Sequence, residues 1–288
     1  MQVLKPNISL IDDAFKVNEV ENNRLFISIS FNGISYSIIN NANNQFFVLE
    51  SYSFQKQETL FQLCENISQI SKENPILKQG FNDVTILIQN HKSTLIPNSL
   101  FDESNKKQYF EFNQIIENAE DILVDQLANI KAVNLFAINQ SLLQNLKNNF
   151  PKAKIIHSST ALIESLFIIN KTKSAIEEVY LNIQSNYFEI IYFKDSKLQL
   201  NNNFNYKTAE DFAYYLLFAF EQLQIKPDEI KVTLLGEIEK DSAIYEYLFK
   251  YIMNIEFISR NEKFNYSEKI QSLPSHYFYL LLNSATCV

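Results

Sequence analysis

Three histidines and two cysteines are the side chains best suited to bind a metal or act as nucleophiles, and they lie far apart. They are His91, His157, His276, Cys64 and Cys287. A structural zinc site takes four Cys or His ligands, which usually come in closely spaced pairs. No such pair occurs here, and no spacing suggests a disulfide framework. We therefore expect neither a bound metal nor a disulfide.

His157 precedes Ser158, Ser159 and Thr160, an order that fits either a Ser–His pair or the start of a helix. Hydroxyl side chains are favoured at helix N-termini because they accept hydrogen bonds from the free backbone N–H groups there. We favour capping by these hydroxyls over catalysis. His276, in LPSHYFYLLL, is expected to start the last helix.

Glycine is scarce, which limits the kinds of phosphate site that the chain can build. Gly33, Gly80 and Gly236 are its three glycines among 288 residues, whereas average usage is about 7%. The loops of P-loop NTPases and of dinucleotide-binding folds each need two or more glycines within a few residues. The sequence therefore excludes both loops.

Charge and hydropathy indicate which partners to expect. The net charge of −8 argues against nucleic acid, because nucleic-acid binders carry a basic face. The segment MQVLKPNISLIDDAF lacks the pattern of a signal peptide. Apolar runs such as YFYLLL (277–282) are far shorter than the roughly 20 residues of a membrane span. We expect a cytoplasmic protein with neither nucleic acid nor a membrane span.

The stretch LFISISFNGISYSII, residues 25–39, is typical of a β-hairpin. Apolar and polar residues alternate on both sides of Asn32-Gly33, and this period of two indicates strands with one buried face. Asn-Gly is a strong turn signal because both residues tolerate positive φ. A third strand at 46–54, a helix at 58–70 and a strand at 84–88 are predicted to follow.

The second half repeats this order. EEVYLNIQSNYFEII, residues 177–191, is predicted to form a hairpin with its turn at Ser185-Asn186. A third strand is expected from Leu198, a helix from Thr208 with Asp211 completing a capping box, and a strand at 232–235. Between the halves we predict strands at 122–127, 133–138 and 154–157 and helices at 140–149 and 160–169. No linker is rich in Gly, Pro or Ser.

The duplicated β-β-β-α-β pattern resembles the actin-like ATPase superfamily, and most closely a bacterial family of unknown function with this fold. Residues 95–117 resemble the inserted subdomain of its pilus-assembly members, and HSSTALIESLFI (157–168) resembles their crossing between halves. The resemblance implies an α/β fold with two duplicated β-β-β-α-β-α domains and mixed sheets. Domain 1 would be 1–172, with an insertion near 92–130. Domain 2 would be 173–288, with a helix at 275–286 returning to the first.

The resemblance also implies where a nucleotide would bind. Active members carry an Asp and a Gly in each hairpin, for Mg²⁺ and for phosphate, and two glycines near adenosine. The matching positions and their neighbours, which we take as candidate binding residues, are Ser30, Asn32, Gly33, Asn182, Gln184, Ser185, Gly236 and Glu237.

These substitutions predict a degenerate nucleotide cleft, because Mg²⁺ prefers charged oxygen ligands and side chains crowd a phosphate turn. Polar turn residues without a ligand role are a simpler account of Ser30, Asn32, Asn182 and Gln184. For Gly236, a strand-end turn with positive φ is an alternative to contact with adenosine. No catalytic residue is assigned.

The function that these residues favour is a non-catalytic binding or scaffold protein with a protein partner and no cofactor. The alternative is a divergent ATP-binding protein or weak ATPase that recruits Mg²⁺ through carboxylates elsewhere. A cleft adapted to a neutral small molecule is a third possibility. A two-metal nuclease is excluded, because residues 25–39 contain no Asp or Glu.

Overall fold

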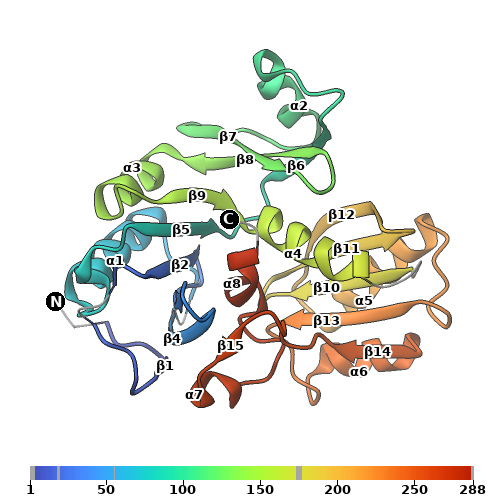
Figure 1. Ribbon diagram of the computed structural model, residues 1–288. Coiled ribbons are helices and arrows are strands. Elements are labelled where there is room, and N and C mark those ends of the chain that lie inside the picture. Colours follow the sequence, from blue (N-terminus) through green and yellow to red (C-terminus); the bar gives the residue numbers. More distant parts are fainter. Residues whose placement is uncertain (1–3, 18–19, 55, 173–176, 287–288) are drawn as a thin grey trace. The chain divides into compact units, whose positions relative to one another are not determined.

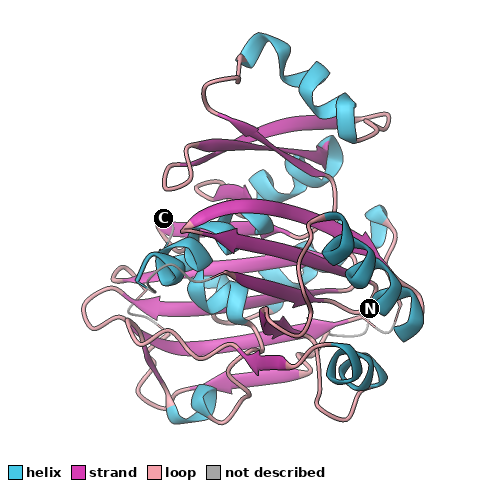
Figure 2. Cartoon of the chain, turned by 90° about the vertical axis from the view of Figure 1, so that its right-hand side faces the viewer, coloured by secondary structure: helices cyan, strands magenta, loops and turns pink. Residues whose placement is uncertain are grey.

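The computed structural model describes residues 4–17, 20–54, 56–172 and 177–286. The chain divides into two compact units (Figure 1), and helices and strands both contribute to the fold (Figure 2). Unit 1 comprises Met1–Leu162, Asn261–Leu273 and Leu281–Val288, and unit 2 comprises Ile163–Arg260 and Pro274–Leu280.

Unit 1 is built on a seven-stranded mixed sheet of order β1-β4-β3-β2-β5-β9, in which β15 also pairs with β4. The strands are β1 (Ile8–Ile11), β2 (Asn23–Ser30), β3 (Gly33–Asn40), β4 (Gln45–Ser53), β5 (Asp83–Ile88), β9 (Lys154–His157) and β15 (Asn265–Tyr266). Strands β2, β3 and β4 form an antiparallel meander, and β5 and β9 continue the sheet in parallel with β2. Both β1 and β15 pair with the outer edge of β4 and cover it.

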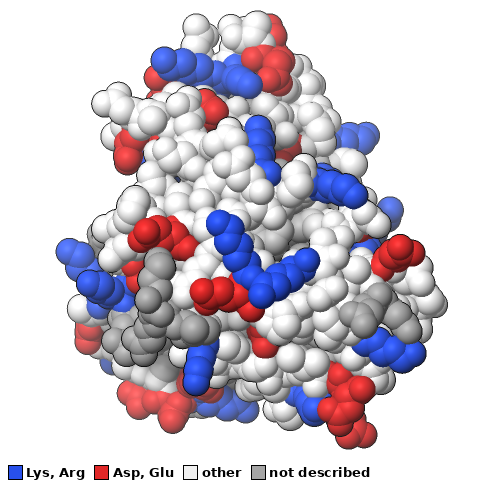
Figure 3. Space-filling view, turned by 90° about the vertical axis from the view of Figure 1, so that its left-hand side faces the viewer, with Lys and Arg blue, Asp and Glu red and all other residues white. Residues whose placement is uncertain are grey.

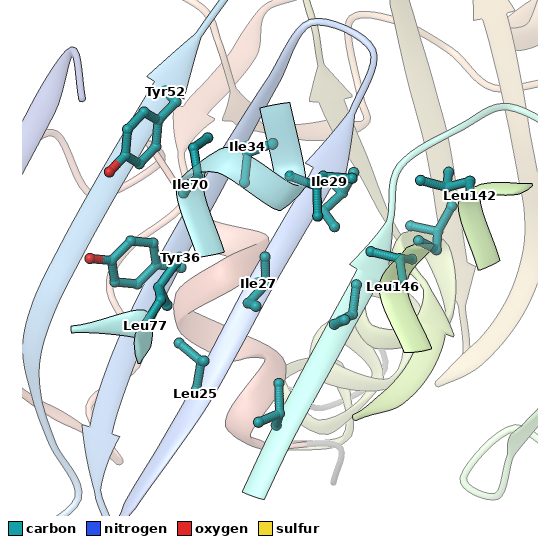
Figure 4. Packing of buried hydrophobic residues seen from close by; sticks show 14 of the residues in the cluster. Leu25, Ile27, Ile29, Ile34, Tyr36, Tyr52, Ile70, Leu77, Leu142 and Leu146 are labelled. Carbon is teal, nitrogen blue, oxygen red and sulfur yellow. The ribbon is translucent and has the colours of Figure 1, made fainter. Parts of the chain in front are cut away.

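Helices α1 (Leu60–Glu73) and α3 (Gln140–Asn149) share a hydrophobic core with this sheet (Figure 4). Alternate residues of β2, from Leu25 to Ile29, face the helices because side chains alternate along a strand. Thr59 begins α1 with a capping box that Gln62 completes. The unit also contains η1 (Leu77–Gln79), α7 (Glu268–Gln271) and η3 (Ser284–Thr286).

A separate antiparallel sheet of order β6-β8-β7 lies between β5 and α3 in the chain. Its strands are β6 (Ser93–Pro97), β7 (Glu120–Leu127) and β8 (Ala132–Asn139), and its helices are η2 (Glu103–Asn105) and α2 (Lys106–Asn113). Phe110 of α2 packs on Leu135 and Ala137 in a small core of its own. Because β8 pairs with both β6 and β7, this inserted sheet extends to Asn139.

Unit 2 contains a five-stranded mixed sheet of order β12-β11-β10-β13-β14. The strands are β10 (Glu178–Ile183), β11 (Tyr187–Lys194), β12 (Lys197–Asn205), β13 (Lys231–Gly236) and β14 (Asn254–Phe257). Helices α5 (Ala209–Gln222) and α6 (Ala243–Tyr251) supply Phe212, Leu216 and Leu248 to its core. Helix α4 (Ser158–Thr172) begins in unit 1 and continues into unit 2, and α8 (Tyr279–Asn283) does the reverse.

The two large sheets repeat one topology, as the sequence predicted. Strands β4-β3-β2-β5-β9 correspond in order and direction to β12-β11-β10-β13-β14. In each half the meander leads into a helix that a threonine caps, Thr59 or Thr208, and then into a parallel strand. The structure adds elements that the sequence did not indicate, namely β1, β6, α2, α6, β14, β15 and α7. Most of these are short, so they show too few residues for a period to be recognised.

Two predicted boundaries are wrong. The first hairpin turns at Phe31-Asn32 and not at Asn32-Gly33, because Ser30 already pairs with Gly33. The last helix begins at Tyr279, and His276 lies in the turn before it.

Acidic and basic side chains are interspersed on the face of the molecule in Figure 3, and no continuous basic patch crosses that face. Among the described residues, no helix combines the length and the apolar character that crossing a bilayer requires.

Candidate nucleotide-site residues

The first candidate turn satisfies its own backbone groups. The hydroxyl oxygen of Ser30 accepts hydrogen bonds from the backbone N–H groups of Asn32 and Gly33, at 3.2 and 3.1 Å. The carbonyl oxygens of Phe31 and Asn32 accept from Glu58 and Phe54, each at 2.8 Å. A phosphate at this turn would therefore have to displace the Ser30 hydroxyl to reach these N–H groups.

Gly33 is required by a close approach between strands and not by its φ angle. Neither Asn32 nor Gly33 has a positive φ, contrary to what the Asn-Gly signal predicted. A Cβ atom on Gly33 would lie 2.7 Å from the carbonyl oxygen of Tyr52 on β4. Two consecutive positive φ angles occur instead in unit 2, at Asp195 and Ser196 (φ 52° and 56°), in the turn between β11 and β12.

The second candidate turn is also closed by its own side chains. The Gln184 side-chain amide donates to Asn182 Oδ1 at 3.0 Å, and Asn182 Nδ2 donates to Glu189 Oε2 at 3.3 Å. The backbone N–H of Gln184 donates to the carbonyl oxygen of Tyr187 at 2.9 Å. Asn182 is 3% exposed, so its amide is part of a buried network and does not project into solvent.

Gly236 is the last residue of β13 and Glu237 follows it, and both lie directly against this turn. Gly236 pairs with Ile183 at the parallel ends of β13 and β10. Its φ is +94°, and its N–H donates to the carbonyl oxygen of His276 at 3.1 Å. The N–H of Glu237 donates to the Ile183 carbonyl at 2.6 Å. The positive φ agrees with a strand-end turn, which is the non-ligand account of this glycine.

The carboxylate of Glu237 accepts a hydrogen bond from the backbone N–H of Ser185. This N–H belongs to the turn that the resemblance assigns to phosphate, so an anionic side chain of the protein already occupies that donor. Glu237 carries the one charge among the eight candidate positions, and that charge is negative. Burial raises the pKa of Glu237, and the hydrogen bond from Ser185 partly offsets this. When ionised, the Glu237 carboxylate opposes a phosphate at this turn.

The eight candidate positions thus form two groups. Ser30, Asn32 and Gly33 share one turn of unit 1, and the other five lie together in unit 2. In the described part of the chain, no three His, Cys, Asp or Glu side chains are grouped so that they could hold a metal ion.

Sequence reasoning missed a buried polar cluster at the start of α4. Asp125 on β7 accepts hydrogen bonds from the backbone N–H of His157 and from the Thr160 hydroxyl, both at 2.7 Å. Asn134, opposite Asp125 on β8, donates to the same hydroxyl at 3.0 Å. Asp125 lies 32 residues before His157 in the chain, so no local sequence signal exists for this contact.

His157 is a neutral structural histidine. Its Nδ1 accepts the N–H of Ser159 at 3.2 Å, so Nε2 carries the proton and donates to the carbonyl oxygen of Asn90 at 3.1 Å. Burial lowers the pKa of His157 to about 4. Both nitrogens are engaged by backbone groups, so the ring is not available to activate a serine. His276 is similar, since its Nε2 donates to the carbonyl oxygen of Ile238 at 2.9 Å.

A family model described as "Protein of unknown function (DUF3822)" matches residues 12–255, and no curated protein matches the chain. A Bacteroides thetaiotaomicron protein of actin-like ATPase fold and unknown function is 24% identical, with a TM-score of 0.78 over 89% of this chain and 97% of that chain. PilM of the PilM–PilN type IV pilus biogenesis complex is 12% identical, with a TM-score of 0.64 over 92% and 98%. EutJ, an ethanolamine utilization protein from Carboxydothermus hydrogenoformans, is 7% identical, with a TM-score of 0.50 over 95% and 90%. These similarities show the actin-like ATPase fold.

Proposed function

Because the chain belongs to the DUF3822 family and has the actin-like ATPase fold, we propose that it is a binding or scaffold protein with degenerate nucleotide-binding positions. In this proposal the chain uses its fold to present surfaces to another protein and does not turn over a nucleotide. The PilM neighbour was solved in a complex with PilN, so the fold is compatible with that use.

The observation that carries the proposal is the hydrogen bond from the Ser185 N–H to the Glu237 carboxylate. A bound phosphate would need this N–H and would also lie beside the Glu237 carboxyl group, which is negative when ionised although burial raises its pKa. At an effective dielectric of about 20, two unit charges 4 Å apart repel by about 4 kcal/mol. When Glu237 is ionised, such a term alone would weaken binding by about a thousandfold.

The first turn supports the same proposal. Ser30 stands where the resemblance places a metal-binding Asp, and its hydroxyl instead closes the turn on itself. A neutral hydroxyl gives Mg²⁺ no charge, and hydrogen bonds to charged groups contribute about 1.5–3 kcal/mol each. Phosphoryl transfer depends on charge neutralisation and positioning, so turnover would be reduced further than binding.

We expect Mg-ATP at about 1 mM to raise the melting temperature by no more than about 1 °C, measured by calorimetry or dye fluorescence. A millimolar Kd would stabilise the protein by about 0.4 kcal/mol and a micromolar Kd by about 4 kcal/mol. With about 2–4 °C per kcal/mol for a chain of this size, the two cases differ by close to 10 °C. A rise of several degrees in the wild type would instead favour the alternative, a divergent ATP-binding protein.

Two variants show whether Glu237 is the cause. Glu237→Gln removes the charge beside the Ser185 N–H, and Glu239→Gln removes a nearby exposed charge that accepts from Tyr277. Only Glu237→Gln should increase the shift that Mg-ATP produces. Equal responses of the two variants would show that Glu237 does not exclude the phosphate.

A further inference from the structure

Helix α5 carries an exposed aromatic surface, which we call the α5 stripe: Tyr214, Tyr215 and Phe218. These side chains are 65%, 36% and 46% exposed, while Phe212 and Leu216 on the opposite side of the helix are buried in the core of unit 2. Adjacent exposed aromatic residues are unusual on a solvated helix face, and contiguous apolar patches mark interaction sites.

The duplication within the chain shows what this face looks like without aromatic residues. Aligning the capping boxes of α1 and α5 places Thr59 on Thr208 and Gln62 on Asp211. In this alignment the positions of Tyr214, Tyr215 and Phe218 are occupied in α1 by Glu65, Asn66 and Gln69. The fold therefore does not need aromatic side chains at these positions, and another function accounts for them better.

The stripe is held in place by contacts among its own rings. Tyr214 stacks on Phe218 with ring centroids 6.2 Å apart and meets Tyr215 edge-on at 5.4 Å. Tyr215 also stacks on Phe204 of β12, at 5.8 Å. Rings that are already ordered lose little conformational entropy when a partner covers them.

Acidic residues lie at both ends of the stripe. Glu210 precedes it by one helical turn and Glu221 follows Phe218 by three residues, and both are exposed. Glu210 accepts a hydrogen bond from the Tyr247 hydroxyl at 2.7 Å, and because this bond stabilises the carboxylate it lowers the pKa of Glu210. The sequence of α5, AEDFAYYLLFAFEQ, contains no Lys or Arg.

We propose that the α5 stripe docks an amphipathic segment of another protein, with an apolar centre and Lys or Arg on both sides. The aromatic rings would cover the apolar centre, and Glu210 and Glu221 would attract the two basic ends. A second copy of α5 fits less well, since it would bring acidic ends toward acidic ends, and an anionic membrane would be repelled in the same way. The proposal rests on the proposed function as a binding protein and names its surface.

The test uses a synthetic peptide with apolar residues at helical spacing, one Trp among them, and Lys at both ends. The chain has no Trp, so fluorescence of the peptide's Trp reports binding without background. We expect the Tyr214→Gln/Tyr215→Asn/Phe218→Gln variant to bind at least about tenfold more weakly than wild type. Replacing the peptide's Lys by Glu should weaken binding at least as much.

Phe61→Gln on α1 is the matched control, because Phe61 is an exposed aromatic residue, 69% accessible, in the equivalent helix. It should leave the affinity unchanged, and an unchanged melting temperature of the triple variant would show that its fold is intact. Equal binding of the Lys and Glu peptides, or wild-type affinity in the triple variant, would overturn the proposal. So would self-association, or binding to anionic vesicles, that the triple variant abolishes.

The two proposals fail in different ways. Absence of peptide binding together with a negligible Mg-ATP shift would remove the α5 docking site and leave the binding-protein proposal in place. A large Mg-ATP shift would remove the binding-protein proposal whatever the peptide does.

Discussion

Gly236→Ala is expected to destabilise the protein by about 2–5 kcal/mol and to lower its melting temperature by about 10 °C. A Cβ atom at this position would lie 2.1 Å from the carbonyl oxygen of Ile183, so the ends of β10 and β13 would have to separate. The same carbonyl accepts the Glu237 N–H at 2.6 Å, and that hydrogen bond would be strained as well. The φ of +94° adds a penalty of about 1–2 kcal/mol for any residue with a side chain.

The other two glycines separate the effect of the positive φ from that of the close contact, because each has only one of the two. Gly80 has a φ of +70°, and a Cβ atom added there would have no neighbour within 4 Å, so Gly80→Ala should cost only about 1 kcal/mol, from the backbone torsion alone. Gly33→Ala meets the Tyr52 carbonyl at 2.7 Å without a positive φ, and overpacking of this kind costs about 1–3 kcal/mol.

Thermal unfolding of the three variants under one set of conditions gives the order of their effects. We expect Gly236→Ala to melt lowest, Gly33→Ala in between and Gly80→Ala nearest to wild type. If Gly236→Ala melted as Gly80→Ala does, β10 and β13 would not approach each other as closely as described.

The glycines also illustrate how far the sequence predicts this fold. Local patterns were sufficient for the duplicated strands and for the Thr208–Asp211 capping box, because period and capping depend on neighbours in the chain. The Asn-Gly signal misplaced the first turn, since the position of Gly33 is set by a contact with Tyr52 on another strand. Tolerance of a positive φ is a property of glycine itself. The lack of space for a Cβ atom at Gly33 depends instead on how β3 and β4 pack in the sheet.

At the candidate site too, local sequence signals predict the elements but not the contacts between residues that are distant in the chain. All eight positions follow from the resemblance. The two predicted hairpins are observed, and Gly236 and Glu237 lie at the end of β13 beside the second one. The sequence could not indicate that Glu237 binds the Ser185 N–H, because the contact depends on β13 lying in register beside β10. It also could not indicate Asp125, whose partners His157 and Thr160 are distant in the chain.

Asp125 and His157 are expected to give opposite pH dependences of stability over the same range. Burial raises the pKa of Asp125 to about 6, although the N–H of His157, the Thr160 hydroxyl and Lys154 partly offset it. The native state then binds more protons than the unfolded state, whose Asp titrates near 3.9. Stability from this group is therefore lost as pH rises from about 4 to about 6, by at most about 3 kcal/mol.

His157 has the opposite sign. Burial lowers its pKa to about 4, with a smaller contribution from His91, although the hydrogen bond to the Asn90 carbonyl partly offsets this, whereas an unfolded histidine titrates near 6.5. The unfolded state binds the additional proton, so stability from His157 is lost as pH falls through this range, again by at most about 3 kcal/mol. In the wild type the two contributions largely cancel, and each becomes visible only when the other is removed.

Urea unfolding of single variants between about pH 4 and pH 7 tests this. The stability of Asp125→Asn relative to wild type should rise with pH, and that of His157→Gln should fall. Asp125→Ala removes the same titrating group but also leaves the His157 N–H and the Thr160 hydroxyl without their acceptor, so it should lie about 2–4 kcal/mol below Asp125→Asn at every pH. If the profiles of Asp125→Asn and His157→Gln ran parallel to that of the wild type, the cluster would not be buried as described. If instead Asp125→Ala matched Asp125→Asn, hydrogen bonding by Asp125 would not be what holds β7 to the start of α4.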